Sequence, residues 1–525
     1  MTLLQTIITG RIVLLLALAS LCLGLALSPT ISRRLRILGF VVLVGALIGY
    51  ANFGALHPRG SGYRSGPIHY YGAFHYFMGA EYFPEVGHSG LYEATLVAAH
   101  DLGALQLIAA VRDLMSYTVR PAGAVDGDAV RARSSKERWR QFKDDLVFFG
   151  ARIDAWPELF LDRGYNDPPP RALLLHALVD RLPATSLTLS VLTALDYVFV
   201  AAAFAAAWRA FGALPSTLAL AFFALSFFAR FDWIGGSLVR WDWIAAVILG
   251  AAAYARGQGT IAGVCLGYAA LARIFPIAFF VPLAVKWVQG RFRRTPDSVL
   301  GACLGSGLGL VVLVWAVVAV SGESHTHAQD FVSKIRMHAQ DPSINSVGLG
   351  SVLVFGKALW LTTPEGAVYV TEAAIAAARP ARYLLPLIST LYLLVVLPLV
   401  LRARTVESLM YAVPLIYCGL SLSGYYYSFL VLLVLLPWKP ASGIKQVSLL
   451  EIALLAGFTA ASYVFEFVSA DFLPLFYQAS IQLGLFFLVW VGLEYVRLGF
   501  LGSRFAESAR MLHSRTPAAP PSAPA

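Results

Sequence analysis

The distribution of apolar stretches constrains the fold of this chain more than any other feature of the sequence. About thirteen stretches are long enough to cross, or nearly cross, a hydrocarbon core of about 30 Å. They lie near residues 12–29, 37–54, 186–208, 217–230, 241–255, 260–272, 275–289, 298–320, 383–401, 408–421, 429–437, 447–467 and 479–499. Backbone polar groups in lipid must be paired within the spanning segment, which favours helices. We therefore expect an all-α polytopic membrane protein with about 11–13 transmembrane helices, in which residues 1–500 form one transmembrane domain.

The composition agrees with a membrane protein. Of the 525 residues, 58% are hydrophobic and only 13% are charged, and the mean hydropathy is +0.69. A soluble domain carries about 45–50% apolar residues. The formal net charge is +10, but the basic residues are dispersed as short clusters between the apolar stretches. This pattern indicates membrane topology rather than nucleic-acid binding, so no nucleic-acid partner is expected.

The basic clusters predict how the chain is oriented. They comprise Arg33, Arg34 and Arg36; Arg209; Arg256; Lys286, Arg291, Arg293 and Arg294; Arg402 and Arg404; Lys439 and Lys445; and Arg497, Arg504 and Arg510. When the spans are counted along the chain, every cluster falls on the same side, which the positive-inside rule assigns to the cytoplasm. The N-terminus is then outside, and the Pro/Ala-rich tail at 501–525 is expected to be cytoplasmic and largely disordered.

Most of the unusual polar residues fall on the other, extracytoplasmic side. Two long loops near 55–185 and 321–381 lie there, together with short turns at 231–242, 273–276 and 423–428. The long loops contain amphipathic pieces, such as residues 96–115, that suit helices lying along the membrane interface. Loops from distant parts of the sequence thus share one face, where they can assemble a site over a membrane bundle.

The stretch HYYGAFHYFMGAEYFPEVGHSGLYEA at 69–94 combines histidines, carboxylates and aromatic residues. His75, Glu81 and Glu85 are candidate catalytic residues here, because a general base that activates a hydroxyl group must accept its proton within hydrogen-bond reach. The alternative is an interfacial belt, in which the aromatic rings lie at headgroup level and the carboxylates point to water.

A second candidate segment is GYNDPPPRALLLHALVDRLP at 164–183, where a polar turn leads through three prolines into an apolar run. The prolines prevent a continuous helix and fix the turn. Tyr165, Asn166 and Asp167 would then be held rigidly at the membrane surface as substrate-binding residues. Alternatively, Asn166 or Asp167 caps the helix that follows.

Two arginines lie at the outer ends of apolar stretches. Arg240 and Asp242 occur in RWDW, and Arg273 occurs in RIFP. An arginine buried at such a depth is costly unless it is paired, and its fork of N–H groups suits phosphate, so these three residues are candidates for substrate binding. The alternatives are a local ion pair between Arg240 and Asp242, and snorkelling of Arg273 to the outer headgroups.

The second long loop contains GESHTHAQDFVSKIRMHAQDPSINSVGLG at 322–350. Imidazole and carboxylate groups suit zinc or manganese, but the spacing of its His and Asp residues is not a specific signature. Those residues are His325, His327, Asp330 and His338. A solvated amphipathic segment is the favoured interpretation, so neither a metal site nor a cofactor is expected. Lys334, Arg336 and His338 could still contact an anionic substrate.

Taken in order, these motifs resemble the GT-C class of membrane glycosyltransferases, and within it the bacterial mannosyltransferase-like families that use polyprenyl-phosphate sugars. The resemblance covers roughly residues 40–440. It rests on GAFHYFMGAEYFPEVGHSGLYEA in an outer loop, GYNDPPPRALLLHAL leading into a span, AGVCLGYAALARIFP ending in a basic residue and proline, NSVGLGSVL, and SGYYYSFLVLLVLLP before a late span.

The resemblance implies a lipid-phosphate-linked sugar donor, a cell-envelope acceptor and an inverting transfer outside the bacterial inner (cytoplasmic) membrane. In such families an Asp usually stands about where this chain has His75, and a Lys often precedes the proline where this chain has Arg273. His75, Glu85 or Glu81 would therefore be the base that deprotonates the acceptor. The expected partners are the lipid-linked donor and membrane lipids.

Two other classes of function compete with this hypothesis. A transporter or lipid flippase needs ionisable residues within the bundle near the membrane midplane, for which Asp196 and Glu466 are the clearest candidates. A non-enzymatic assembly scaffold needs none of the proposed site residues, so it predicts that their substitution leaves envelope glycans unchanged.

Overall fold

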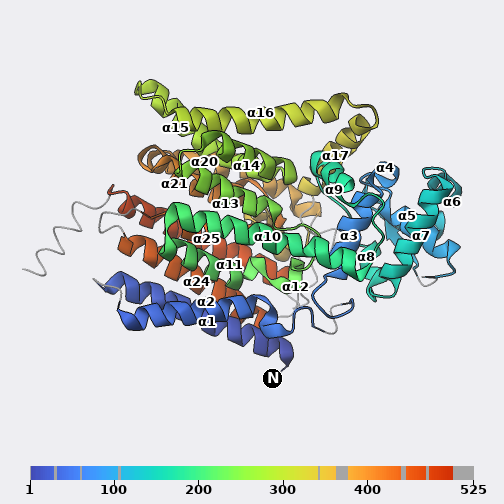
Figure 1. Ribbon diagram of the computed structural model, residues 1–525, viewed down its shortest axis with the longest axis horizontal. Coiled ribbons are helices and arrows are strands. Elements are labelled where there is room, and N and C mark those ends of the chain that lie inside the picture. The colour runs from blue at the N-terminus through green and yellow to red at the C-terminus, as the bar shows by residue number, and fades with distance from the viewer. Residues whose placement is uncertain are drawn as a thin grey trace, which may run out of the picture.

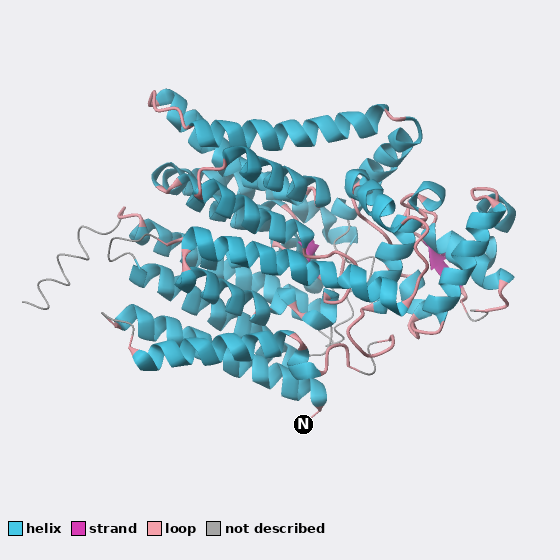
Figure 2. Ribbon diagram, viewed as in Figure 1, coloured by secondary structure: helices cyan, strands magenta, loops and turns pink. Residues whose placement is uncertain are grey.

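The computed structural model describes residues 2–28, 32–58, 62–104, 108–340, 343–361, 376–438, 445–468 and 472–500. Helices make up most of the chain in these ranges, as the sequence predicts. Figure 2 shows strands only as small isolated pieces, which are two antiparallel pairs. They are β1 (Ala110–Arg112) with β2 (Val119–Pro121), and β3 (Ser346–Val347) with β4 (Leu422–Ser423). The tail at 501–525 lies outside the described residues.

Most of the helices run side by side in one bundle (Figure 1). Its long members are α1 (Leu3–Leu27), α2 (Arg33–Tyr50), α10 (Ser186–Phe211), α16 (Ser298–Val320), α20 (Leu385–Arg402), α24 (Lys445–Val468) and α25 (Phe472–Arg497). Shorter members are α11 (Ala213–Leu225), α13 (Asp242–Ala255), α14 (Gly259–Ala272), α15 (Phe280–Phe292), α18 (Leu349–Leu361), α22 (Ala412–Gly419) and α23 (Val431–Leu435). Most residues of these helices are apolar.

Six described helices are long and apolar enough to cross a membrane. They are Leu3–Leu27, Ser186–Phe211, Ser298–Val320, Ala376–Arg402, Gln446–Val468 and Leu473–Arg497. A seventh span would be the pair Ala213–Leu225 and Phe227–Ile234, which is bent by 67°. The expectation of an all-α multi-pass membrane protein is therefore confirmed. The count of about 11–13 spans stays a prediction, because the remaining apolar stretches form helices shorter than the about 20 residues that a full crossing requires.

The first long loop forms a helical subdomain at one end of the bundle (Figure 1). Its helices are α3 (Tyr70–Glu81), α4 (Phe83–Val86), α5 (Leu91–Asp101), α6 (Gly127–Arg131), α7 (Lys136–Gly150), α8 (Trp156–Phe160) and α9 (Pro169–Val179). Its core includes an edge-to-face cluster in which Phe74 contacts both Phe149 and Trp156. The prediction of one amphipathic helix over 96–115 is wrong, because α5 ends at Asp101. Gly103 then adopts a positive φ of 65°, and the chain continues into β1.

The second long loop begins with α17 (Gly322–Gln340), which follows α16 and lies beside α9 (Figure 1). The Nζ of Lys334 donates hydrogen bonds to the carbonyl oxygens of His88 (2.7 Å) and Tyr165 (3.0 Å). Both carbonyls belong to the subdomain of the first loop. A lysine of the second loop therefore ties α17 to that subdomain.

The two ends of the bundle differ in the chain segments and arginines that lie there. The N-terminal end of α1 lies at the end nearest the α3–α9 subdomain (Figure 1). The next helix, α2, starts with Arg33 at the opposite end, and α10, which leaves the subdomain, reaches Arg209 in its last turn. The N-terminus and the first long loop therefore share one end of the bundle, as the charge pattern predicts.

Candidate functional site

Asp167 is the centre of a buried ion-pair network at the start of α9. Its side chain is fully buried, and its two oxygens accept hydrogen bonds from Arg171 and Arg273. No side chain caps α9, which begins at the prolines after Asp167. The alternative in which Asn166 or Asp167 caps this helix is therefore wrong. Asp167 instead joins the first long loop to the bundle.

Arg171 connects the same network to Asp242. The Nε of Arg171 donates to Asp242 Oδ2 at 3.1 Å, and its Nη2 donates to the carbonyl oxygen of Val239. The hydroxyl group of Tyr268 also donates to Asp242, at 2.7 Å. Asp242 is thus paired with Arg171 rather than with Arg240, so the proposed local ion pair of Arg240 and Asp242 is wrong. Sequence reasoning missed Arg171, although its spacing of four residues from Asp167 was a usable signal.

Arg240 is buried without a carboxylate partner among the described residues. Its guanidinium carbon lies 3.9 Å from the centre of the Tyr76 ring and 4.9 Å from that of Tyr425. Its Nη1 has no hydrogen-bond partner. The backbone N–H groups of Arg240 and Trp241 both donate to Asp196, at 2.8 Å, which fixes the turn that carries the arginine. A buried cation of this kind is available for an anionic ligand.

Arg273 follows the last residue of α14 and points inward. It is 4% exposed and pairs with Asp167 through Nη1, so it does not snorkel to the headgroups. Its Nε and Nη2 have no hydrogen-bond partner. The guanidinium carbon lies 5.8 Å from the ring centre of Tyr76 and 5.7 Å from that of Tyr426. Two nitrogens of the buried Arg273 guanidinium therefore have free N–H groups.

Tyr76 joins the three arginines, which we call the arginine cluster: Arg171, Arg240 and Arg273. All three guanidinium groups lie within 6.0 Å of its ring centre. Tyr76 is only partly buried, as are Tyr425 and Tyr426, whose rings lie near Arg240 and Arg273. The cluster holds three guanidinium charges, and the two carboxylates paired with it are Asp167 and Asp242. This surplus of positive charge, with free N–H groups and aromatic walls, suits a phosphate. Tyr76 was missed because its role depends on helices far apart in the sequence.

His75 precedes Tyr76 in α3 and has both ring nitrogens occupied. Nδ1 lies 2.9 Å from the carbonyl oxygen of Tyr71 and must donate to it, so Nε2, at 2.7 Å from the hydroxyl oxygen of Tyr92, accepts. Burial lowers the pKa of His75, and the charges of Arg240 and Lys334 act in the same direction, while Asp162 raises it. His75 is therefore a neutral imidazole at pH 7. Asp162, which sequence reasoning did not single out, is the carboxylate that acts on it most strongly.

Glu81 and Glu85 lie elsewhere in the subdomain, around Arg138. The Nε of Arg138 donates to Glu85 at 2.8 Å, and Glu81 accepts from Gln141 at 2.6 Å with Arg138 at 3.7 Å. The backbone carbonyl of Glu81 contacts His176, near the C-terminal end of α9. The arginine cluster lies at the other end of this helix, which is about 16 Å long at 1.5 Å per residue. The structure therefore does not bring the two glutamates to the cluster.

Tyr165 and Asn166 have different positions in the turn before α9. The Tyr165 ring is buried at 5.6 Å from that of Tyr76, edge to face, and its hydroxyl group has no hydrogen-bond partner. Asn166 Nδ2 donates to the carbonyl oxygens of Arg163 (3.2 Å) and Gly164 (3.1 Å). Tyr165 thus lies beside the cluster, whereas Asn166 stabilises the turn.

The histidines of the second long loop form no metal site in the described part of the chain. No group of three or more His, Cys, Asp or Glu side chains that could hold a metal ion occurs there. The His327 ring centre lies 4.6 Å from that of Phe83 in the first loop, with the two rings tilted by 41°. The side chains of His325 and His338 lie outside the described residues.

Burial lowers the pKa of Lys334 to about 7, although the charge of Asp162 opposes this shift.

The two acidic residues that a transport mechanism would use have structural partners. Asp196 in α10 accepts two backbone N–H groups of the turn at Arg240. Glu466 in α24 pairs with Arg230, which also pairs with Asp232. Both carboxylates therefore hold turns and helices of the bundle together.

No protein-family model, no curated protein and no solved structure matches this chain. The helices and their hydropathy alone place it among the all-α multi-pass membrane proteins.

Proposed function

We propose that this protein is a membrane glycosyltransferase of the GT-C type. It transfers a sugar from a polyprenyl-phosphate-linked donor to a cell-envelope acceptor on the extracytoplasmic side of the bacterial inner membrane. The N-terminus is outside, the C-terminus is cytoplasmic, and the short helices complete about 11–13 crossings by tilting or pairing. One observation carries the proposal: Arg240 and Arg273 are buried, adjacent to one tyrosine ring, and retain unpaired N–H groups.

The donor phosphate is the ligand that this cluster suits best. A guanidinium group binds phosphate oxygens through paired, charge-assisted hydrogen bonds. As the bond between the anomeric carbon and the phosphate oxygen breaks, the electron pair leaves with the phosphate. Arg240 and Arg273 stabilise the charge that develops there, and they need little reorganisation because Asp167 and Tyr76 already hold them.

The acceptor hydroxyl oxygen forms the new bond to the anomeric carbon from the opposite face, and its proton passes to a base. Among the three candidates, His75 is adjacent to the cluster because it precedes Tyr76 in α3. Its Nε2 lone pair accepts from Tyr92, so the acceptor hydroxyl must displace the tyrosine hydroxyl from that nitrogen. Glu81 and Glu85 are held by Arg138 instead. We therefore assign the role of base to His75.

The test uses cells in which the gene for this protein is deleted. These cells are complemented with wild type, Arg273→Ala, Arg240→Ala or His75→Ala. Arg256→Ala is the matched control, since Arg256 follows α13 at the opposite end of that helix from Arg240. The three site variants are expected to truncate envelope glycans and to accumulate lipid-linked sugar, whereas the control restores the wild-type profile. Normal glycans in the site variants would support the scaffold hypothesis. Normal glycans combined with lost solute uptake on substitution of Asp196 and Glu466 would support a transporter.

A further inference from the structure

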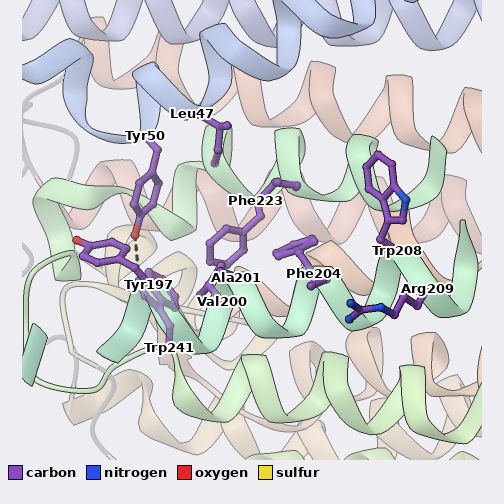
Figure 3. A pocket seen from close by; sticks show the side chains of 13 residues that line it. Leu47, Tyr50, Tyr197, Val200, Ala201, Phe204, Trp208, Arg209, Phe223 and Trp241 are labelled. Atoms are coloured by element: carbon purple, nitrogen blue, oxygen red, sulfur yellow. Dashed lines mark hydrogen bonds between the residues drawn. The ribbon is translucent and has the colours of Figure 1, made fainter. Parts of the chain in front are cut away.

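An apolar groove of about 600 Å³ lies between α2, α10 and α11, and Trp241, which follows Arg240 of the arginine cluster, lines one end of it (Figure 3). One face of α10 forms its floor. Ala201 and Ala205 are one turn apart on this face, and their methyl groups leave open the space between Tyr197 and Trp208. Val200 and Phe204 of the same helix also line the groove.

The two ends of the groove differ chemically. At one end, Trp241 Nε1 donates to the hydroxyl oxygen of Tyr50 at 3.0 Å, beside Tyr197 (Figure 3). At the other end lie Trp208 and Arg209, in the last turn of α10. Among the described residues, Arg209 is the only charged side chain that lines the groove. It is exposed and makes no ion pair or side-chain hydrogen bond within the described ranges.

The length of the groove matches one leaflet of a bilayer. Tyr197 and Trp208 are eleven residues apart, which corresponds to about 16 Å along a helix. This is about half of a hydrocarbon core of about 30 Å. The groove starts near the middle of the spanning helix α10 and ends at the basic end of the bundle, where Arg256 and the N-terminal arginines of α2 also lie.

We infer that this groove binds an anionic phospholipid from the leaflet at the basic end of the bundle. Its phosphate contacts Arg209, and one acyl chain lies over Ala201 and Ala205 with its end against Tyr50 and Trp241. The charged side chain of Arg209 lies at the end of the groove opposite Trp241. This direction supports a phospholipid rather than the chain of a lipid-linked donor. The phosphate of such a donor would be at the arginine cluster, and its chain would then enter from the Trp241 end.

Native mass spectrometry of the full chain, released from nanodiscs that contain phosphatidylglycerol, phosphatidylcholine and a polyprenyl phosphate, tests the inference. We expect wild type to retain phosphatidylglycerol. Arg209→Gln should weaken binding of this lipid about fivefold, the effect of one basic side chain at an anionic lipid surface. Ala205→Trp, which fills the groove, should abolish retention. Arg256→Gln is the matched control and should retain the lipid. Equal retention in wild type, Arg209→Gln and Ala205→Trp would refute the inference.

Quenching of tryptophan fluorescence by brominated lipids measures the direction in which the bound acyl chain runs. Phosphatidylglycerol that is brominated at the end of its chain should quench Trp241, and lipid brominated near the headgroup should quench Trp208. Each signal is identified by its loss in Trp241→Phe or Trp208→Phe. Retention of a polyprenyl phosphate instead, or quenching of Trp241 by the headgroup-proximal bromine, would overturn the assignment. These outcomes do not depend on glycosyl transfer, so this inference and the proposed function can fail separately.

Discussion

The guanidinium group of Arg240 stacks on the ring of Tyr76, with 3.9 Å between the guanidinium carbon and the ring centre. Arg240 follows the bent pair α11–α12 (Phe231–Ile234), and Tyr76 belongs to the first long loop. The contact therefore joins the bundle to the subdomain that covers it. Cation–π attraction partly offsets the cost of burying this charge, and the Nη1 of Arg240 has no hydrogen-bond partner and is free for an anion.

Replacement of Arg240 should separate stability from function. Arg240→Gln removes a buried cation that has no carboxylate partner, so the unfolding temperature should stay the same or rise. Binding of a polyprenyl phosphate should be lost at the same time. Thermal unfolding in detergent, with and without the polyprenyl phosphate, measures both effects. A large drop in the unfolding temperature without ligand would show that Arg240 is structural.

Replacement of Asp167 should have the opposite effect on stability. Asp167→Asn leaves Arg171 and Arg273 without their shared counter-ion, and breaking a buried pair costs about 3–5 kcal/mol. Thermal or chemical unfolding in the same detergent measures the loss. Asp128→Asn is the control, because Asp128 pairs with Arg131 at a fully exposed side chain, where ion pairs contribute about 0–1 kcal/mol. Equal effects of the two substitutions would contradict the central position of Asp167.

Glu81 offers a test between structural and catalytic roles. Burial, with the nearby charge of Asp145, raises the pKa of Glu81 to about 9, while Arg138 opposes this shift. The folded state therefore holds a proton on Glu81 that the unfolded chain loses above about pH 4.5, and stability falls as the pH rises from there to about 9. Glu81→Gln mimics the protonated form. The unfolding temperature of Glu81→Gln should therefore fall less with rising pH than that of wild type. Sugar transfer by this variant should stay intact. Abolished transfer would make Glu81 a candidate base again.

The proposed role of His75 sets the acidic limit of activity. A base must be unprotonated, and burial lowers the pKa of His75. Transfer should therefore stay constant as the pH falls through the ordinary histidine value of about 6.5, and decline only below it. The pH dependence of transfer by the purified enzyme measures this limit. An acidic limb above pH 6.5 would point to another group, and unchanged transfer in His75→Gln would exclude His75 as the base.

Lys334 should make the attachment of α17 depend on pH. Burial lowers its pKa from the model-peptide value of about 10.4 to about 7. Between these values the unfolded or detached state binds more protons than the folded one, so stability rises with pH from about 7 to about 10. The unfolding temperature of wild type should rise over this range relative to Lys334→Met. Parallel curves for the two proteins would contradict the assignment.

The sequence by itself determined the class of fold. Apolar length and the positions of basic residues are local properties, so the helical segments and the shared side of the N-terminus and first loop could be predicted. Arg240, Arg273 and Asp167 were also found, because a charge or a polar turn beside an apolar stretch is visible locally. The predicted helix over 96–115 failed, because a glycine in a left-handed conformation ends α5 within it.

Only the tertiary structure decided which of these residues meet. Asp167 and Arg273 are 106 residues apart, and Arg171 and Asp242 are 71 residues apart. No local pattern specifies such pairs. In the structure, Asp242 pairs with Arg171 and not with Arg240. Glu81 and Glu85 lie beside Arg138, and Tyr76 lies among three arginines. A buried charge is stable where helices from distant parts of the chain supply its partners, so packing alone decided which cations were neutralised and which remained free.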